Sequence, residues 1–454
     1  MRFRSSFLRH VMLLLLAIAG QAHAASLQID GQPSGEAFNL TPYWKVLEDP
    51  SRQWNIDDVR APDLAQRFAP PSENSDSLNF GITDSAVWLR VTLQNPSDDE
   101  LFRRLELAYP SLHYVDLYTV TPDGMKHMET GVLRPFAQRP VPHRHFVFPL
   151  RLAARSDTTL YLRVASSGSL NVATKLWHTR AFTEKILHEY MMQAFYFGLV
   201  IALGLFNLLL FISLRDPTYF YYVLFAASSA LSLLAYSGLG LQFVWPEATD
   251  WAVIATMIAF ALNGAALLQF QRRLLTTSRI VPALDRVMLA FIGLNGLQIF
   301  AFLWSFEHTL RVGIAMDVAN ILLALVVAIA CQRRGQRSAP FFLVAFAGLA
   351  VTALLTAARS FGVSGIPNFI TIYGIQIGSA LEMLLFSLAL ADRFNQLRQE
   401  KEYAQQQLVD NLKRSERLLE LRVEERTAEL SRRNDELKQH ELALKASKET
   451  AEES

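Results

Sequence analysis

The sequence has very little cysteine and no overall excess of charge. Cys331 is the single cysteine among 454 residues, so no disulfide can form within the chain, and any exported domain must be held by its own hydrophobic core. The formal net charge is +1, which gives no indication of nucleic-acid binding. The chain also lacks a phosphate-binding glycine loop and a nucleophile elbow. We therefore expect no catalytic residue, cofactor or nucleic-acid partner.

Apolar residues are abundant, at 51% of the chain, and they are concentrated in seven runs. A hydrocarbon core of about 30 Å needs roughly 20 apolar residues per helix, and each run comes close to that length. An odd number of spans places the two flanking regions on opposite sides of a membrane. The predicted spans are residues 193–214, 219–240, 251–271, 287–305, 310–331, 340–360 and 369–391.

The first residues, 1–24, resemble a secretory signal peptide. Basic residues precede a short apolar run, Val11–Ala19, and Ala22-His23-Ala24 matches an A-x-A cleavage site. The alternative is a first membrane anchor, but the run is too short to cross a bilayer. We therefore expect cleavage and an N-terminus outside the cytoplasm.

The loop charges predict the same topology independently. Arginines are plentiful in the loops after the first, third and fifth spans and scarce in the alternate loops. Because basic loops stay in the cytoplasm, the C-terminus is predicted to be cytoplasmic. The arginines of the basic loops are Arg215, Arg272, Arg273, Arg279, Arg286, Arg333, Arg334 and Arg337.

The region 25–185 is predicted to be a periplasmic domain made mostly of strands. Aliphatic residues alternate with polar or aromatic ones around 87–93, 115–117 and 160–164, and turn residues bound these segments. A period of two, repeated at short intervals, is typical of an antiparallel β-sandwich whose aliphatic faces form the core.

The opposite faces of these strands carry aromatic and arginine side chains. Such residues can stack on a sugar or similar polar ligand and hydrogen bond to it, so they are candidate ligand-binding residues. The alternative is that they pack under loops or at the sandwich edge, with each arginine paired to a carboxylate. The candidates are Trp88, Arg90, Tyr118, Tyr161 and Arg163.

His143 and His145 place two imidazoles on one side of an extended segment, which is compatible with a metal site. No cysteine or carboxylate stands nearby in sequence at ligand spacing. We therefore expect no metal.

The membrane bundle is predicted to span 190–393. Asparagines in membrane helices commonly hydrogen bond to a neighbouring helix, and we expect this of Asn207, Asn263, Asn295 and Asn320. Asp317 and Glu382 differ, because carboxylates in hydrocarbon are costly and are candidates for signalling. Glu382 either joins a polar lock that differs between signalling states or is a protonated or paired carboxyl at the membrane edge.

The last segment, 394–454, lacks glycine and proline and is predicted to be one helix continuing from the last span. Its heptad seam predicts a coiled coil, although the alternate layer is polar and a solvated spacer is an open alternative. The seam consists of Leu412, Leu419, Val423, Leu430, Leu437 and Leu444.

Several short stretches resemble the bacterial seven-transmembrane receptors with diverse intracellular signalling modules (7TMR-DISM). The resemblance implies a jelly-roll sensory domain for carbohydrate-like ligands, followed by a seven-helix bundle. In the exported part the stretches are Phe80-Gly81-Ile82-Thr83, Ala86-Val87-Trp88-Leu89-Arg90, Tyr161-Leu162-Arg163-Val164 and Trp177. In the bundle they are Asn207, Arg215-Asp216, Tyr219, Leu381-Glu382 and Leu388–Arg393.

The helical tail also resembles segments that precede signalling output domains. Arg422–Leu430 is similar to the helix before the output domains of sensor kinases and diguanylate cyclases, and Ala443–Ser454 resembles the approach to a kinase dimerisation helix. Hybrid sensor histidine kinases of the RetS and LadS type have a similar arrangement. The resemblance implies the sensory half of such a kinase, in a phosphorelay, acting as a homodimer or a heterodimer with another kinase.

The expected function is therefore a membrane sensory receptor module that detects an extracytoplasmic small molecule or glycan. Its output is expected either in a longer polypeptide or in a partner. Two alternatives stay open: the sensory module of a diguanylate cyclase, or a transporter or channel with a periplasmic cap.

Overall fold

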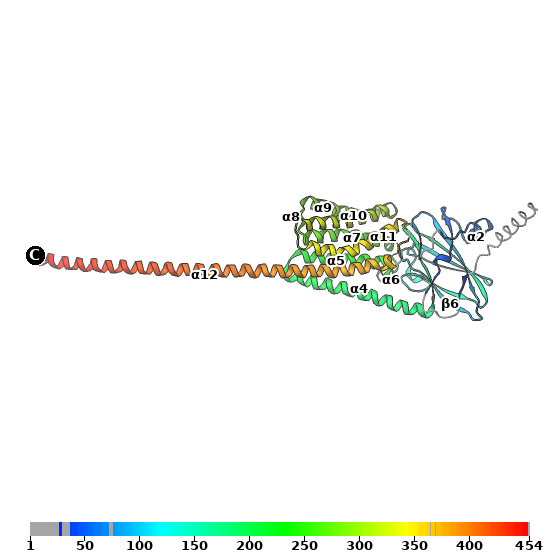
Figure 1. Ribbon diagram of the computed structural model, residues 1–454, viewed down its shortest axis with the longest axis horizontal. Coiled ribbons are helices and arrows are strands. Elements are labelled where there is room, and N and C mark those ends of the chain that lie inside the picture. The colour runs from blue at the N-terminus through cyan, green and yellow to red at the C-terminus, as the bar shows by residue number, and fades with distance from the viewer. Residues whose placement is uncertain (1–26, 30–36, 72–75, 364, 368, 453–454) are drawn as a thin grey trace, which may run out of the picture. The chain divides into compact units, whose positions relative to one another are not determined.

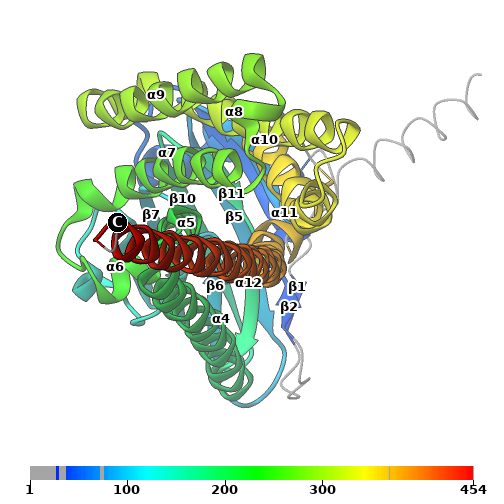
Figure 2. The ribbon, with the colours of Figure 1, turned by 90° about the vertical axis from the view of Figure 1, so that its left-hand side faces the viewer.

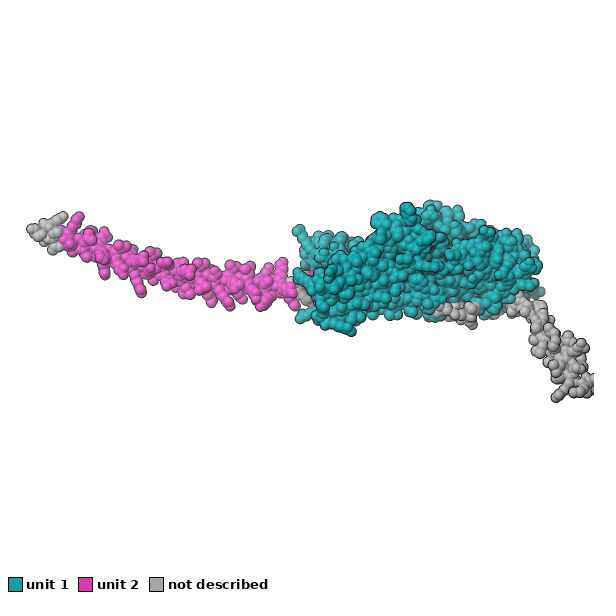
Figure 3. Space-filling view, turned by 90° about the horizontal axis from the view of Figure 1, so that it is seen from above, with its two compact units in different colours: residues 1–387 teal, residues 388–454 magenta. Residues whose placement is uncertain are grey.

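The computed structural model describes residues 27–29, 37–71, 76–363, 365–367 and 369–452. The predicted signal peptide, 1–24, lies outside the described residues. The chain forms two compact units, Met1–Ser387 and Leu388–Ser454 (Figure 3), and each is described by itself.

The first unit opens with a β-sheet domain. Its largest sheet has the order β1-β5-β10-β7-β8, with β3 also paired to β5; a second sheet has the order β2-β12-β6-β9, and β4 pairs with β11. The strands are β1 (Leu27–Gln28), β2 (Phe38–Asn39), β3 (Lys45–Asp49), β4 (Leu78–Ile82), β5 (Ala86–Asn95), β6 (Leu101–Leu107), β7 (Tyr114–Thr121), β8 (Gly124–Thr130), β9 (Phe146–Leu152), β10 (Ser156–Ala165), β11 (Ser169–Val172) and β12 (Thr174–His178).

Both large sheets contribute to one hydrophobic core. Leu162 on β10 lies opposite Leu89 on β5 and Leu117 on β7, while Leu105 on β6 pairs with Phe148 on β9. All five side chains are buried in the same cluster. The predicted alternation is thus confirmed, because the aliphatic positions of each strand point to the shared core.

Short helices lie between or beside the strands. The segment between β3 and β4 contains two of them, and it covers the face of β5 and β10 that points away from the main core. These elements are η1 (Thr41–Tyr43), α2 (Ile56–Arg60), α3 (Pro62–Ala65) and η2 (Phe136–Gln138).

A helical bundle follows the β-sheet domain (Figures 1 and 2). Among the described residues, seven helices are long and apolar enough to cross a membrane. The predicted spans are confirmed, but the first helix starts at Thr179, well before residue 193. The helices are α4 (Thr179–Leu214), α5 (Pro217–Tyr236), α6 (Leu239–Phe243), α7 (Thr249–Leu274), α8 (Thr277–Ile280), α9 (Pro282–Trp304), α10 (Phe306–Arg333), α11 (Ala339–Ser360), the π-helix η3 (Ile370–Gly374) and α12 (Ile375–Glu452).

Asparagines join the helices, as predicted. Asn295 on α9 and Asn320 on α10 exchange two hydrogen bonds of 3.0 and 2.9 Å. Asn207 donates to Ser387 Oγ over 3.0 Å, and Asn263 accepts from two serines of α5. These bonds satisfy amide groups that hydrocarbon would otherwise leave unpaired.

The glycines of the bundle differ in how closely a neighbouring helix approaches them. A Cβ on Gly378 of α12 would stand 2.9 Å from Leu349 Cα, so α11 and α12 approach each other as closely as a glycine permits. A Cβ on Gly204 of α4 would meet nothing within 4 Å. Only the first of these glycines is therefore required for close helix contact.

α12 is one uninterrupted helix of 78 residues that begins in the first unit and makes up the described part of the second. The predicted seam residues, from Leu412 to Leu444, are all exposed in the single chain. This confirms the predicted helix, while the coiled coil stays a prediction.

Candidate functional site

Two predicted ligand-binding residues lie inside the β-sheet domain and not on its surface. Trp88 is fully buried and Tyr161 is 8% exposed, both in a small cluster with Phe68 and residues of α2. The sequence shows that they share a face, but it does not show that the segment between β3 and β4 covers this face. The structure thus supports the alternative of packing under a loop for these two residues.

Tyr118 and Arg90 border the same cluster. The Tyr118 ring stacks against Trp88 on one side and His127 on the other, with ring centroids 5.8 and 4.1 Å away. The Arg90 guanidinium lies 4.5 Å from the centre of the Phe68 ring. Both side chains are partly exposed, so ligand binding by them stays a prediction.

Arg163 has a different environment, because it lines a cavity of about 230 Å³. Its Nη2 donates to the backbone oxygen of Arg52 over 3.0 Å, and its Nη1 lies 3.4 Å from Asp116 Oδ2. Arg52 and His113 line the same cavity. Ligand binding by Arg163 stays a prediction, and the cavity gives this residue an open space to face.

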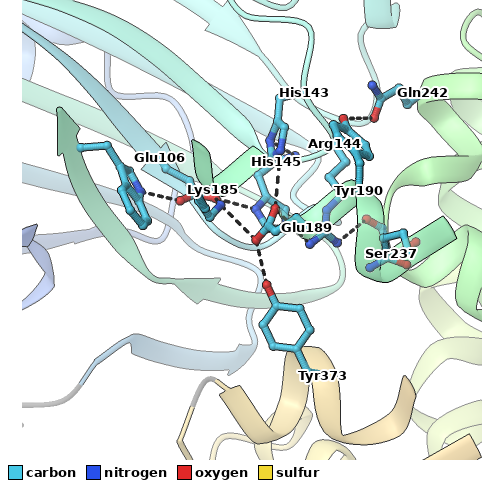
Figure 4. A network of polar contacts seen from close by, with 12 residues as sticks. Glu106, His143, Arg144, His145, Lys185, Glu189, Tyr190, Ser237, Gln242 and Tyr373 are labelled. Atoms are coloured by element: carbon cyan, nitrogen blue, oxygen red, sulfur yellow. Dashed lines mark hydrogen bonds and ion pairs between the residues drawn. The ribbon is translucent and has the colours of Figure 1, made fainter. Parts of the chain in front are cut away.

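A buried polar cluster forms where the β-sheet domain meets the bundle (Figure 4). The segment before β9 supplies His143, Arg144 and His145, which are all almost completely buried. Arg139 holds this segment, since its Nη1 donates to the backbone oxygens of His143 and Arg144 over 2.6 and 2.9 Å. Burial lowers the pKa of Arg139 to about 10, so it stays charged at neutral pH.

Glu106 on β6 is the carboxylate at the centre of one half of the cluster. It receives hydrogen bonds of 2.7 Å from His145 Nδ1 and from Trp177 Nε1, and it pairs with Lys185. Burial raises the pKa of Glu106, but the Lys185 charge and the His145 hydrogen bond outweigh it, and the pKa ends well below its ordinary range. Glu106 is therefore an anion with its charge compensated inside the protein.

His145 is the neutral partner of Glu106. Burial and the nearby Arg144 charge lower the pKa of His145 to about 3. Since an ionised carboxylate can only accept, the Nδ1 of His145 must carry the proton that it donates.

Glu189 on α4 is the centre of the other half. Its carboxylate accepts from the Tyr373 hydroxyl over 2.7 Å and lies 3.1 Å from Lys185 Nζ. Arg144 Nη2 and His143 Nε2 are 3.4 and 3.7 Å from its second oxygen. Lys185 thus bridges Glu106 and Glu189 and joins the two halves of the cluster.

The local fold explains how these residues meet. β12 pairs with β6 and continues directly into α4, so the first turns of α4 stand over the face of β6 that carries Glu106. Lys185 and Glu189 are four residues apart and lie on one side of the helix.

Donor atoms of Glu106, His143 and His145 lie within 4.8 Å of one another, a spacing that a metal site can have. However, Lys185 already pairs with the Glu106 carboxylate, and the Arg144 charge lies close to His145. A divalent cation would have to displace one cation and tolerate another. The cluster is therefore better interpreted as an ion-pair network than as a metal centre.

The network continues into the bundle as a row of polar contacts, here called the α4–α12 seam. It includes the Glu189–Tyr373 bond and a pair of Gln193–Gln376 hydrogen bonds of 3.2 and 2.9 Å. Further along, the hydroxyls of Tyr196 and Ser379 are 3.1 Å apart, and the seam ends at the Asn207–Ser387 bond. The seam connects α4 with η3 and the first turns of α12.

Glu382 lies beside this seam and is fully buried. Among the described residues, none forms a hydrogen bond with either carboxyl oxygen. The polar lock predicted for Glu382 is thus not formed in this conformation, and its role in signalling stays a prediction. Asp317, the other predicted signalling residue, lines a cavity in the bundle.

Comparison with known protein families agrees with this architecture. A family described as 7TMR-DISM extracellular 2 matches residues 41–178, and one described as 7TM diverse intracellular signalling matches residues 189–393. The chain is a 7TMR-DISM receptor. A search of curated proteins found no significant match.

The receptor is accordingly an inner-membrane protein with an extracellular N-terminal domain and a seven-helix membrane domain. Its central cluster is only partly evident from the sequence. The His143–His145 segment is conspicuous, whereas Glu106 is one acidic residue in a strand and meets Lys185 through the packing of α4. The one additional signal is the Lys185–Glu189 spacing on a helical extension of the first span.

Proposed function

We propose that this receptor detects an extracytoplasmic, carbohydrate-like ligand and transmits the signal to a histidine kinase in a two-component phosphorelay. In this proposal the chain is the sensory half, its C-terminus is cytoplasmic, and α12 dimerises as a coiled coil. The output belongs either to the same polypeptide or to a partner kinase.

The cavity beside Arg163 supports ligand detection. Guanidinium groups of Arg52 and Arg163 can donate several hydrogen bonds to hydroxyl or carboxylate oxygens. The cavity also borders the Ser166–Ser167 segment, and Ser167 Oγ donates to Glu307 of α10 over 2.6 Å. A ligand in this cavity therefore contacts a segment that touches the bundle.

The observation that carries the proposal is the continuity of the polar cluster and the α4–α12 seam. Glu106 belongs to the β-sheet domain and Glu189 to the first membrane helix, α4. Tyr373 belongs to η3, the short π-helix that leads into the last membrane helix, α12. A ligand that favours one arrangement of the β-sheet domain can thus shift α12 through buried contacts, provided that it binds the two states with different affinity.

The coupling can be tested with Tyr373→Phe, which keeps the ring and removes the hydroxyl bonded to Glu189. We expect the ratio of active to inactive kinase without ligand to change by about tenfold, since a hydrogen bond to a charged group contributes about 1.5–3 kcal/mol. The measurement is autophosphorylation in membranes that contain the complete signalling system. Tyr403→Phe, an exposed tyrosine of α12, is the control and should leave the ratio unchanged.

The class of output needs its own measurement. Histidine phosphorylation that depends on this receptor supports the proposal. Receptor-dependent synthesis of cyclic di-GMP without histidine phosphorylation would favour a diguanylate cyclase, and solute flux through the receptor in liposomes would favour a transporter. Either result would reject the kinase output.

A further inference from the structure

A cavity of about 230 Å³ extends from the β-sheet domain into the membrane bundle. Its walls come from loops of the β-sheet domain and from α5, α7, α10 and α11. Most of the lining is apolar, including Val132, Trp245, Phe260, Phe306, Leu310 and Phe346. Engineered apolar cavities of this order bind molecules such as benzene, so this one has room for roughly ten non-hydrogen atoms.

Asp317 is the exception in this wall. Among the described residues that line the cavity, it is the only one with a carboxylate, and none is a lysine or an arginine. No described residue is seen to hydrogen bond or form an ion pair with it. An intramembrane carboxyl group that faces a cavity is a candidate functional residue, because its presence there is costly.

Three other polar residues of the wall already have hydrogen-bond partners. Asn320 bonds Asn295 in both directions, and Asn263 accepts two hydrogen bonds from α5. The Tyr236 hydroxyl donates to the backbone oxygen of Thr371 over 3.1 Å. The cavity therefore offers an aromatic and aliphatic surface together with one carboxyl group that has no described partner.

We propose that this cavity binds a small amphipathic amine. The ammonium group pairs with Asp317, and the apolar body packs against Phe306, Phe346 and Trp245. A neutral hydrocarbon would leave the carboxylate unpaired, and a hard metal ion would find too few oxygen ligands among aromatic walls. The proposed amine site is centred on Asp317 in the bundle, whereas the Arg163 cavity lies in the β-sheet domain, and His113 lines both cavities. The proposal does not depend on the class of output.

The test uses the purified receptor in nanodiscs with two probes of equal size, phenethylamine and phenethyl alcohol. Calorimetry against empty nanodiscs removes the contribution of partitioning into lipid. We expect saturable binding of the amine. Asp317→Asn should weaken amine binding by about tenfold or more and change alcohol binding by less than about threefold, because only the amine loses a buried ionic partner.

Ala353→Leu fills the cavity from α11 and should abolish binding of both probes. Two matched controls make the same changes at exposed positions outside the cavity, Asp250→Asn and Ala315→Leu, and should leave both affinities unchanged. All four variants are compared with the parent receptor for melting temperature and size-exclusion profile.

Three results would overturn the proposal: no saturable amine binding, an equal effect of Asp317→Asn on both probes, or unchanged binding in Ala353→Leu. If Asp317→Asn does not give folded receptor, the parent receptor decides the matter with the probe pair. Equal affinity for the amine and the alcohol then rejects a role for the carboxylate.

Discussion

Lys185 shows how much a single side chain contributes to this junction. It is 17% exposed and pairs with two carboxylates that belong to different parts of the fold. Removing one carboxylate leaves Lys185 and the remaining groups with an unbalanced buried charge. Such a loss costs more than the loss of a surface ion pair, because water cannot replace the missing partner.

We therefore expect Glu106→Gln to destabilise the receptor by about 3–5 kcal/mol, as is typical when one partner of a buried pair is removed. The measurement is the melting temperature of the detergent-solubilised receptor. Glu100→Gln is the matched control: Glu100 pairs with the exposed Arg151, and such surface pairs contribute about 0–1 kcal/mol. Equal losses of stability in both variants would show that the charge of Glu106 does not stabilise the buried cluster.

The buried His113 makes the folding stability of the receptor depend on pH. Its Nδ1 accepts a hydrogen bond from the Ser167 amide over 3.2 Å, so protonation would break this contact. Burial lowers the pKa of His113 to about 4 from its ordinary 6.5, with Glu307 opposing and Arg52 adding to the effect. The unfolded chain thus binds more protons between these values, and stability present above pH 6.5 is lost as the pH falls towards about 4.

At about pH 5 this effect amounts to about 2 kcal/mol. We expect the melting temperature to fall between about pH 7.5 and about pH 5, and to fall less in His113→Gln than in the parent. His188→Gln, which replaces an exposed histidine of α4, should keep the slope of the parent. The prediction fails if the two variants have the same slope.

At the scale of elements, α11 and α12 depend on a close approach that α4 does not require. Gly378→Ala places a Cβ against the backbone of Leu349, so we expect a loss of about 1–3 kcal/mol from overpacking. Gly204→Ala has free space and gains helix propensity, so it should be neutral or stabilising by up to about 1 kcal/mol. Melting temperatures of the two variants distinguish them, and a loss in Gly204→Ala would indicate a partner on that face.

The elements that hydropathy can detect were predictable from the sequence. Seven apolar runs are membrane helices because hydrocarbon requires internally satisfied backbone groups. The start of α4 was missed because Thr179–Glu189 carries polar residues that dock on the β-sheet domain and not on lipid. Likewise, alternation placed Trp88 and Tyr161 on one face, but a periodicity cannot show which distant segment covers that face.

For the whole molecule, a second contact between domains lies far from Lys185 in the sequence. Arg359 at the end of α11 is 4% exposed and donates to Ser77 and Thr371, while its backbone oxygen accepts from Asn79 over 2.9 Å. The β-sheet domain thus contacts the bundle through α11 as well as through α4 and α10, and the side-chain bonds of Arg359 are made by a charged donor.

Arg359→Met keeps much of the side-chain volume and removes these bonds. We expect faster cleavage of the loop after α11 by limited proteolysis. The reason is that the contact between α11 and the β-sheet domain loses about 1.5–3 kcal/mol for each hydrogen bond made by a charged donor. The control is Arg311→Met, an exposed arginine of α10. Unchanged cleavage in Arg359→Met would show that the other contacts between the domains, at Lys185 and at Glu307, hold them together without Arg359.

The candidate site was the least predictable part of the molecule. The His143–His145 segment was noticed because two histidines stand close in sequence, yet its partners come from β6, α4 and η3. Contacts of this kind depend on how strands and helices pack and leave no periodic signal. The sequence also could not show that Asp317 has no described partner. It shows a carboxyl group in an apolar span, but it does not show that this group lines a cavity.

The burial of Cys331 has a practical consequence. Because the chain has one cysteine and its side chain is inaccessible within α10, the native protein offers no reactive thiol to a bulky labelling reagent. A cysteine introduced at an exposed position can therefore carry a spin label or fluorophore without prior removal of native thiols. Pairs of such labels allow distances between the β-sheet domain and the membrane helices to be followed in real time while a stimulus is added.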